Sequence, residues 1–155
     1  MKARLYVRVG DLAPDFTTPR LDGGQFKLSE QRGKLVLLDF WATWCQPCLA
    51  EMPSVKDIQQ TFGADPRFVL VGLSCDDGIE RPAEYVKANA LTWTQAFAGK
   101  MLEGVVAETY LIRAIPATFL IGPDGRVLAM DLRGAPLKEA VRKALRDAKL
   151  FSAAK

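Results

Sequence analysis

The chain has 155 residues, of which 49% are hydrophobic and 25% charged, and its formal net charge is +3. This length fits one domain, which buries roughly 70% of its unfolded surface and therefore needs no disulfide or metal to fold. The sequence contains no histidine, which excludes a Ser-His-Asp triad, a Cys-His protease and a histidine metal site. Three cysteines are too few for a disulfide-stapled fold, and no run of ~18 apolar residues predicts a transmembrane helix.

Neither the distribution of charged residues nor the N-terminal stretch predicts a particular binding partner or cellular compartment. Basic residues concentrate only over 138–149, where Glu139 can pair with Arg142 and Lys143 at helical spacing. This pattern indicates a solvated helix face, so we expect no nucleic-acid binding. The opening stretch MKARLYVRVGDLAPDF lacks the apolar core of a signal peptide. We expect either a cytoplasmic protein or an exported one whose signal or anchor has been removed.

The first half of the chain predicts a lead-in, a buried strand and a helix. Residues 10–33 are rich in Gly, Pro, Asp and Thr, which indicates an irregular lead-in with short strands, one of them over 25–28. The run LVLLDFWA, residues 35–42, is typical of a strand buried on both faces. Apolar residues then recur at helical spacing over 47–62: Leu49, Met52, Val55, Ile58 and Phe62.

The second half predicts alternating elements and a hairpin. FVLVGLS (68–74) reads as a second buried strand, followed by helices over 82–90 and 102–110. ATFLIG (117–122) and RVLAMDL (126–132) flank a Pro-Asp-Gly turn and should form a hairpin. A closing helix has one apolar face: Leu137, Ala140, Val141, Ala144, Leu145 and Ala148. Together these elements predict an α/β fold with a sheet covered on both faces.

Two cysteines lie where the first buried strand passes into the first helix. If the strand ends near Trp41, Cys45 is the N-cap, Gln46 and Pro47 are the first helical residues, and Cys48 is the third. The Cys45 sulfur then faces the amide of Cys48 and the positive end of the helix dipole, a setting that lowers a thiol pKa from ~8.5 to between ~3.5 and ~7.5. Cys48 lies one turn into the helix, close enough to close a disulfide. We therefore expect an exposed nucleophile and a buried resolving partner.

Other uses of the two cysteines fit less well. A structural zinc site needs four Cys or His ligands, and this chain offers one further cysteine, Cys75, which is expected to pack in the core. A disulfide that closes a loop of two residues removes little entropy from the unfolded chain, so a purely structural bond is a poor explanation. Redox exchange is the remaining interpretation, and we expect neither a metal nor another cofactor.

The segment DFWATWCQPCLAEMP, residues 39–53, resembles the active site of the thioredoxin superfamily, and specifically of its TlpA/ResA-like branch. The lead-in from Gly10 and the stretch YLIRAIPATFLIGPDGRVLAMDLRG are similar to the same branch, so the resemblance spans about residues 10–148. It implies a thioredoxin fold: a central mixed β-sheet with helices on both faces and an N-terminal extension with short strands. It also implies a single domain over 1–155, with the lead-in at 1–33 and the core at 34–150.

The resemblance also implies roles for individual residues. Cys45 matches the attacking cysteine and Cys48 the resolving one, while Pro116 matches a proline held in the cis form beside the disulfide. The implied substrate-binding residues surround the cysteines: Trp44, Gln46, Pro47, Ile115 and Pro116. Pro53 matches a proline that kinks the active-site helix.

Two acids are candidate proton carriers. Asp39 lies six positions before Cys45 in an apolar strand, where thioredoxins place a buried acid beneath the cysteines. A buried carboxyl has a raised pKa and can take the proton of Cys48, directly or through a water. The alternative is that Asp39 ends its strand at the surface. Glu51 matches an acid of some relatives and could share the proton role, or it is a helix-surface glutamate.

These residues predict a thiol–disulfide oxidoreductase that exchanges its dithiol with disulfides in client proteins. Gln46 and Pro47 carry no charge and no histidine, which among the relatives favours a reductant, of the thiol-maintenance or cytochrome c maturation type. An upstream thiol reductant would reopen the disulfide, and we expect a monomer. One alternative is a peroxiredoxin-type peroxidase, but Ala42 stands where that family has threonine, three residues before the reactive cysteine. The other is a non-catalytic thioredoxin-like binding module.

Overall fold

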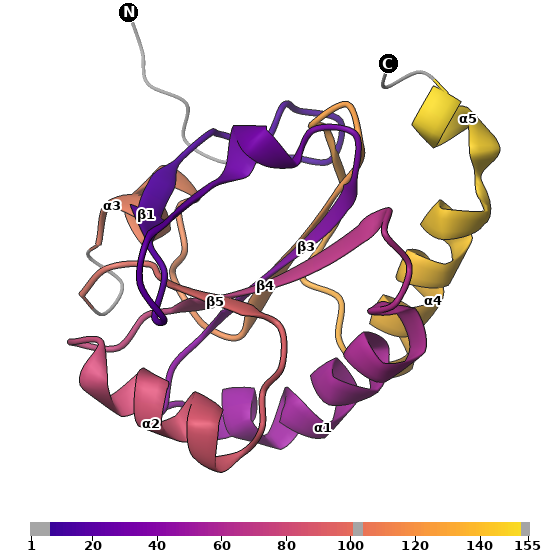
Figure 1. The fold of residues 1–155 in the computed structure, drawn as a ribbon. Coiled ribbons are helices and arrows are strands. Elements are labelled where there is room, and N and C mark those ends of the chain that lie inside the picture. The colour runs from indigo at the N-terminus through magenta and orange to yellow at the C-terminus, as the bar shows by residue number, and fades with distance from the viewer. Residues whose placement is uncertain (1–6, 101–103, 153–155) are drawn as a thin grey trace, which may run out of the picture.

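The structure, a computed structural model, describes residues 7–100 and 104–152 (Figure 1). Its strands are β1 (Thr17–Pro19), β2 (Gln25–Lys27), β3 (Leu35–Trp41), β4 (Phe68–Ser74), β5 (Thr94–Phe97), β6 (Ala117–Ile121) and β7 (Val127–Met130). The central sheet has five strands in the order β5-β4-β3-β6-β7, and β1 and β2 form a separate antiparallel pair. β3, β4 and β5 are parallel, whereas β6 runs antiparallel to β3 and β7 antiparallel to β6, so the sheet is mixed.

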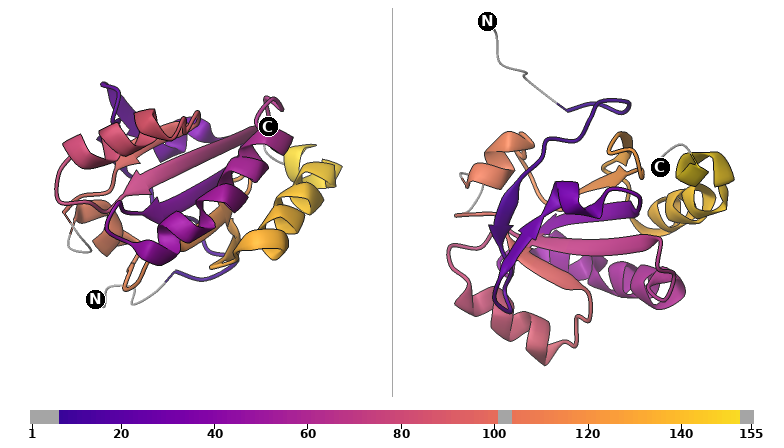
Figure 2. Two further views of the ribbon diagram at one scale, coloured as in Figure 1. Left: turned by 90° about the horizontal axis from the view of Figure 1, so that it is seen from below. Right: turned by 45° about the horizontal axis from the view of Figure 1, so that its top comes forward.

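Helices cover both faces of this sheet. They are the 3₁₀ helix η1 (Leu28–Gln31) and the α-helices α1 (Gln46–Phe62), α2 (Glu80–Ala88), α3 (Val105–Thr109), α4 (Gly134–Arg146) and α5 (Ala148–Ser152). α1 and α2 each connect two neighbouring parallel strands, and right-handed crossovers place such helices on one face. α4 packs against α1 on that face, while α3 and the lead-in lie on the other (Figures 1 and 2). The predicted thioredoxin-type architecture is confirmed.

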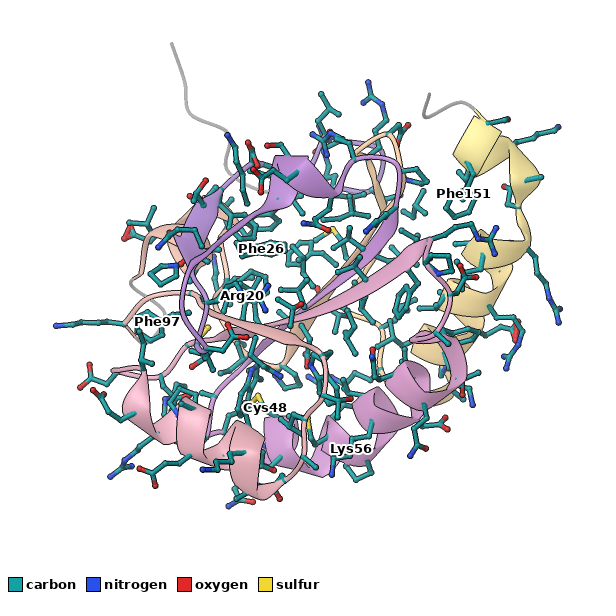
Figure 3. All side chains as sticks on the ribbon, viewed as in Figure 1. Arg20, Phe26, Cys48, Lys56, Phe97 and Phe151 are labelled. Carbon is teal, nitrogen blue, oxygen red and sulfur yellow. A yellow bond between two sulfur atoms is a disulfide. The ribbon has the colours of Figure 1, made fainter. Side chains whose placement is uncertain are left out.

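The two faces of β3 carry different chemistry, because successive residues of a strand point to opposite sides. Trp41 packs against Tyr85 of α2 with ring centroids 5.4 Å apart, so Asp39, two residues earlier, also faces the side of α1 and α2. Phe40 points the other way, into a cluster of aromatic rings that joins the sheet to the lead-in. Its members are Phe16, Phe26, Phe40, Tyr110 and Phe119. Figure 3 labels Phe26, which belongs to β2 of the lead-in, and Cys48 in the first turn of α1.

The lead-in also pairs with both outer strands of the central sheet. The amide of Gly10 donates a hydrogen bond to the carbonyl of Val127 on β7 at 2.8 Å. At the opposite edge the amide of Leu21 donates to the carbonyl of Gln95 on β5 at 2.9 Å. A strand edge left open is a template for association with other chains, and the lead-in covers part of each edge here.

The predicted strands over 35–42 and 68–74, the helix over 47–62 and the hairpin after residue 117 are confirmed within a residue or two at each end. α1 contains two prolines: Pro47 lies in its first turn, and Pro53 lies inside the helix. No helix among the described residues is long and apolar enough to cross a membrane.

Three elements differ from the prediction. The expected closing helix stops at Arg146 and a second short helix begins at Ala148, because Asp147 adopts an extended conformation between them. The helix expected over 102–110 is limited to α3, and residues 102 and 103 lie outside the described residues. β5 was not predicted at all, because four residues are too few for a pattern of alternation and its pairing with β4 is a long-range contact.

Candidate active site

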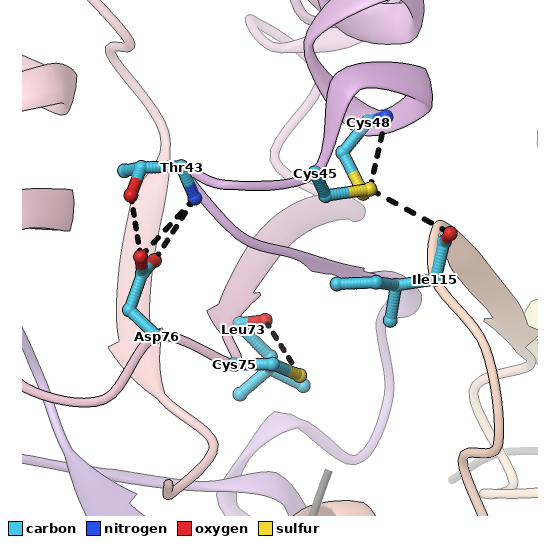
Figure 4. Close-up of a disulfide and its surroundings, with 7 residues drawn as sticks. All are labelled: Thr43, Cys45, Cys48, Leu73, Cys75, Asp76 and Ile115. Atoms are coloured by element: carbon cyan, nitrogen blue, oxygen red, sulfur yellow. Dashed lines mark hydrogen bonds between the residues drawn. A yellow bond between two sulfur atoms is a disulfide. The ribbon is translucent and has the colours of Figure 1, made fainter. Parts of the chain in front are cut away.

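The two cysteines open α1 as their spacing predicts (Figure 4). Cys45 is the N-cap with an extended backbone, and its Sγ accepts a hydrogen bond from the amide of Cys48 at 3.2 Å. Gln46 and Pro47 are the first two helical residues, and both are exposed. Cys45 and Cys48 form a disulfide, with their Cα atoms 5.2 Å apart. After reduction the same amide and the positive end of α1 remain beside the Cys45 sulfur, and both stabilise a thiolate.

The attacking cysteine is less open than the sequence suggests. Cys45 is only 5% exposed, so the expectation of an exposed nucleophile is wrong for the disulfide form. The reason is its two neighbours: Sγ is bonded to Cys48 on one side and lies 3.6 Å from the carbonyl oxygen of Ile115 on another. Cys48 is 2% exposed, which confirms the expectation of a buried partner.

The Ile115–Pro116 loop lies beside the disulfide, just before β6. The peptide bond between these residues is cis, as the resemblance implied, and Pro116 is buried while Ile115 is half-buried. Trp44, the residue before the nucleophile, is 46% exposed. The sequence therefore identified residues that the fold brings to one place, although Cys45 and Ile115 are 70 positions apart in the chain.

Asp39 lies within β3 rather than at a surface end of the strand. It is 4% exposed, and its neighbours in the sheet are Gly72 of β4 and Thr118 of β6. Burial, and next the negative charge of Glu51, raises the pKa of Asp39 to about 7. A carboxyl with this pKa exists in both protonation states near neutral pH, which suits a group that accepts and returns a proton.

Glu51 has a structural contact that the sequence did not indicate. Its Oε2 accepts a hydrogen bond from the amide of Gly134, the first residue of α4, at 2.6 Å. An acidic side chain at this position stabilises the unpaired amides and the positive end of that helix. Glu51 thus links α1 to α4, and it also affects Asp39 through its charge.

A second buried acid, Asp76, lies close to the cysteines and was missed from the sequence. Asp76 is 2% exposed and lies two residues after the end of β4, at the edge where the parallel strands end. Its carboxylate accepts hydrogen bonds from the amide and hydroxyl of Thr43 (Figure 4). It also accepts one from the hydroxyl of Ser74. These bonds fix the turn that leads into Trp44 and Cys45. An acidic residue within two positions of the end of a buried parallel strand is the signal that could have identified it.

The third cysteine takes no part in the disulfide. Cys75 is fully buried, and burial, then the charges of Asp76 and Asp39, raises the pKa of its thiol to about 12. It is therefore an inert packing residue, as predicted. Ala42, at the position where a peroxidase would need threonine, is fully buried as well.

Known proteins resemble this chain over most of its length. The sequence profile of the AhpC/TSA family matches residues 9–130. The thiol-disulfide oxidoreductase ResA of Geobacillus thermodenitrificans is 34% identical over 146 residues, which cover 92% of this chain and 79% of that protein. The thioredoxin-like protein YneN of Bacillus subtilis is 29% identical over 142 residues, covering 92% of this chain and 82% of the relative.

A solved structure agrees with the sequence comparisons. The thioredoxin domain of a thiol-disulfide oxidoreductase from Bacteroides vulgatus superimposes with a TM-score of 0.80 at 31% identity, covering 88% of this chain and 97% of that domain. Fold, cysteine spacing and sequence point to one activity, the exchange of a dithiol with a disulfide. The chain belongs to the AhpC/TSA family and is a thiol–disulfide oxidoreductase of the ResA-like group.

Proposed function

We propose that the protein acts as a reductant that transfers electrons from the Cys45–Cys48 dithiol to disulfides in client proteins. The hydrogen bond from the Cys48 amide to the Cys45 sulfur at the N-terminus of α1 favours the attacking thiolate and supports the exchange reaction. The observation that carries the reducing direction is the chemistry of the two residues between the cysteines. Gln46 and Pro47 add neither a positive charge nor a histidine to that stabilisation. A dithiol form that is stabilised only moderately gives up its electrons more readily, so its couple is more reducing.

The exchange takes place in two steps. First the Cys45 thiolate attacks one sulfur of the client disulfide, a bond forms between these two sulfurs, and the client's other sulfur leaves as a thiolate that takes a proton from water. Cys48 then transfers its proton to the Asp39 carboxylate and attacks Cys45. The Cys45–Cys48 disulfide forms, the bond between Cys45 and the client breaks, and the second client sulfur leaves as a thiolate that takes a proton from water. The client gains two electrons and the protein loses two, which an upstream thiol reductant must return.

Asp39 and Glu51 have different parts in this proposal. Asp39 is the base for Cys48, because it lies on the face of β3 that α1 covers and is ionised in part near neutral pH. Glu51 acts through its charge, which keeps the pKa of Asp39 high. It also holds the beginning of α4 in place.

The client binds, in this proposal, to the surface around the disulfide. Its residues are Trp44, Gln46, Pro47, Ile115 and Pro116. Trp44 offers exposed aromatic area, and the Ile115 carbonyl next to Cys45 offers backbone that an extended client segment can approach. Contacts to the client's backbone and overall shape depend little on its amino-acid sequence. The surface therefore suits a range of disulfide-containing segments.

We also propose that residues 1–155 form one thioredoxin-like domain, with the lead-in at 1–33 and the core at 34–150, and that the domain acts as a monomer. The pairing of the lead-in with both β5 and β7 supports this arrangement. Size-exclusion chromatography with light scattering measures the mass in solution, and a dimer mass at micromolar concentration would contradict it.

A redox titration against glutathione and dithiothreitol, with free thiols counted by mass spectrometry, tests the direction of electron flow. A reversible two-electron couple well below about −180 mV supports a reductant, and a couple at or above that value contradicts it. Cys48→Ser should trap a mixed disulfide with a client protein, whereas Cys45→Ser should trap none. Cys75→Ala is the matched control and should leave the couple unchanged. If no reversible couple forms, the proposal fails.

A further inference from the structure

Three residues lie in one row across the parallel strands. Asp39 of β3 pairs in register with Gly72 of β4, and Gly72 pairs with Gln95 of β5. Residues in register on parallel strands point to the same face of the sheet. The indole Nε1 of Trp41, which shares the face of Asp39, donates a hydrogen bond to Oε1 of Gln95 at 3.1 Å. The side chains of Asp39 and Gln95 therefore lie on the face that α1 and α2 cover.

The glycine in the middle of the row makes room for the glutamine. A Cβ at Gly72 would lie 2.1 Å from Oε1 and 2.9 Å from Nε2 of Gln95, so the amide occupies the space above β4 that any other residue would fill. Neighbouring strands are about 4.8 Å apart, so this amide is about one strand spacing from the side chain of Asp39. That separation is too long for a direct hydrogen bond and suits one bridging water.

The amide and the carboxyl both lack a direct partner. Nε2 of Gln95 is buried, and among the described residues no group accepts a hydrogen bond from it. Gln95 is 5% exposed and Asp39 is 4% exposed. In the described part of the chain, burial and the charge of Glu51 act on the Asp39 carboxyl, and no hydrogen bond contributes. Buried donors and acceptors almost always have partners, and an ordered water is the usual one where protein groups are out of reach.

We infer that Gln95 is a positioning residue for Asp39, holding a water that accepts a hydrogen bond from Nε2 and donates one to the carboxylate. A hydrogen bond donated to a carboxylate favours its ionised form, so the water keeps more of Asp39 ready to accept a proton. The titratable groups that interact with Asp39 through their charge are Glu51 from α1 and Cys75 after β4. Neither of these is positively charged, so the polar amide supplies stabilisation that no neighbouring charge provides. The link to catalysis rests on the proposed role of Asp39 as the base for Cys48.

A surface pocket lies next to Gln95. The pocket has a volume of about 390 Å³ and lies between α2 and β5. Gln95 lines it together with Val86, Lys87 and Trp93, among others.

The test compares the pKa of Asp39 between variants, measured by NMR on the ¹³C-labelled carboxyl of the oxidised protein. Gln95→Met keeps the length and packing of the side chain and removes the donor. We expect it to raise the pKa of Asp39 by about one unit. Starting from a pKa of about 7, such a rise lowers the ionised fraction at pH 7, and with it the rate of the resolving step, about fivefold.

A second variant and a control separate this effect from loss of packing. Gly72→Ala leaves Gln95 in the sequence but pushes its amide away from β4, so it should raise the same pKa. Gln60→Met removes an amide from the exposed side of α1 and should change neither quantity.

The outcomes are distinct. A raised pKa of Asp39 in Gln95→Met, with no change in Gln60→Met, supports the inference. An unchanged pKa in Gln95→Met overturns it, whatever happens to stability. A raised pKa with an unchanged resolving rate keeps the link between Gln95 and Asp39, and it refutes the proposed role of Asp39 as the base.

Discussion

Asp39→Asn should stabilise the protein at neutral and alkaline pH while it slows the exchange reaction. Burial and the charge of Glu51 raise the pKa of Asp39 from 3.8 to about 7 in the folded protein. The folded state therefore holds this proton more tightly than the unfolded state does. Between these two pH values the stability of the wild-type protein falls as pH rises, because Asp39 ionises in the unfolded state while the folded state keeps it protonated.

The size of the effect follows from the two pKa values. One pKa unit corresponds to about 1.36 kcal/mol, so ionisation of Asp39 costs about 4 kcal/mol by pH 8. Asparagine has nearly the same shape and does not ionise. The free energy of unfolding of Asp39→Asn should thus exceed that of the wild type by about 4 kcal/mol at pH 8, relative to the difference between the two proteins at pH 4.

Urea denaturation of the oxidised proteins at pH values from 4 to 8 measures this difference. Asp77→Asn is the control, because Asp77 is an exposed acid after β4 and its loss should leave the pH dependence unchanged. If the stabilities of Asp39→Asn and the wild type stay parallel over this range, Asp39 is not a destabilising buried acid. In that case the argument for its role as a base near neutral pH also fails.

Three further substitutions test other contacts. Glu51→Gln removes the charge that raises the pKa of Asp39, so the pH–rate profile of exchange should move to lower pH, and an unmoved profile would show that the two acids do not interact. Asp76→Ala leaves the amide and hydroxyl of Thr43 without their acceptor and should cost about 2–3 kcal/mol of unfolding free energy in urea. Tyr110→Phe removes a 2.6 Å hydrogen bond to a lead-in carbonyl and should cost about 1 kcal/mol, whereas a loss near zero would mean that the lead-in does not depend on it.

The local part of the active site could be predicted from the sequence. Cys45 and Cys48 are neighbours along one helix turn, and the proline between them fits the first turn, so their geometry depends on only four consecutive residues. β3 and β4 could be predicted for a similar reason: a short, continuous run of apolar residues is typical of a strand that is buried on both faces of a sheet.

The parts that were missed depend on contacts between distant segments. The exposure of Cys45 is set by Ile115, seventy residues later, and the hydrogen bond that Glu51 accepts comes from Gly134. Asp76 resembles any polar residue that follows a strand until the fold brings it to Thr43. The residues next to these positions in the sequence do not indicate which distant segment packs against them.

The sequence by itself determined the redox pair, the helix that activates it and the buried strand that carries Asp39, because hydrophobic periodicity and helix capping act over a few neighbouring residues. Only the tertiary structure decided how that acid is surrounded. No sequence motif identifies Gly72 or Gln95 as neighbours of Asp39. They lie in one row with it because β4 pairs with β3, and β5 with β4, in this register. The pKa of a buried group depends on every charge and dipole within a few ångströms, and those neighbours are set by packing rather than by order along the chain.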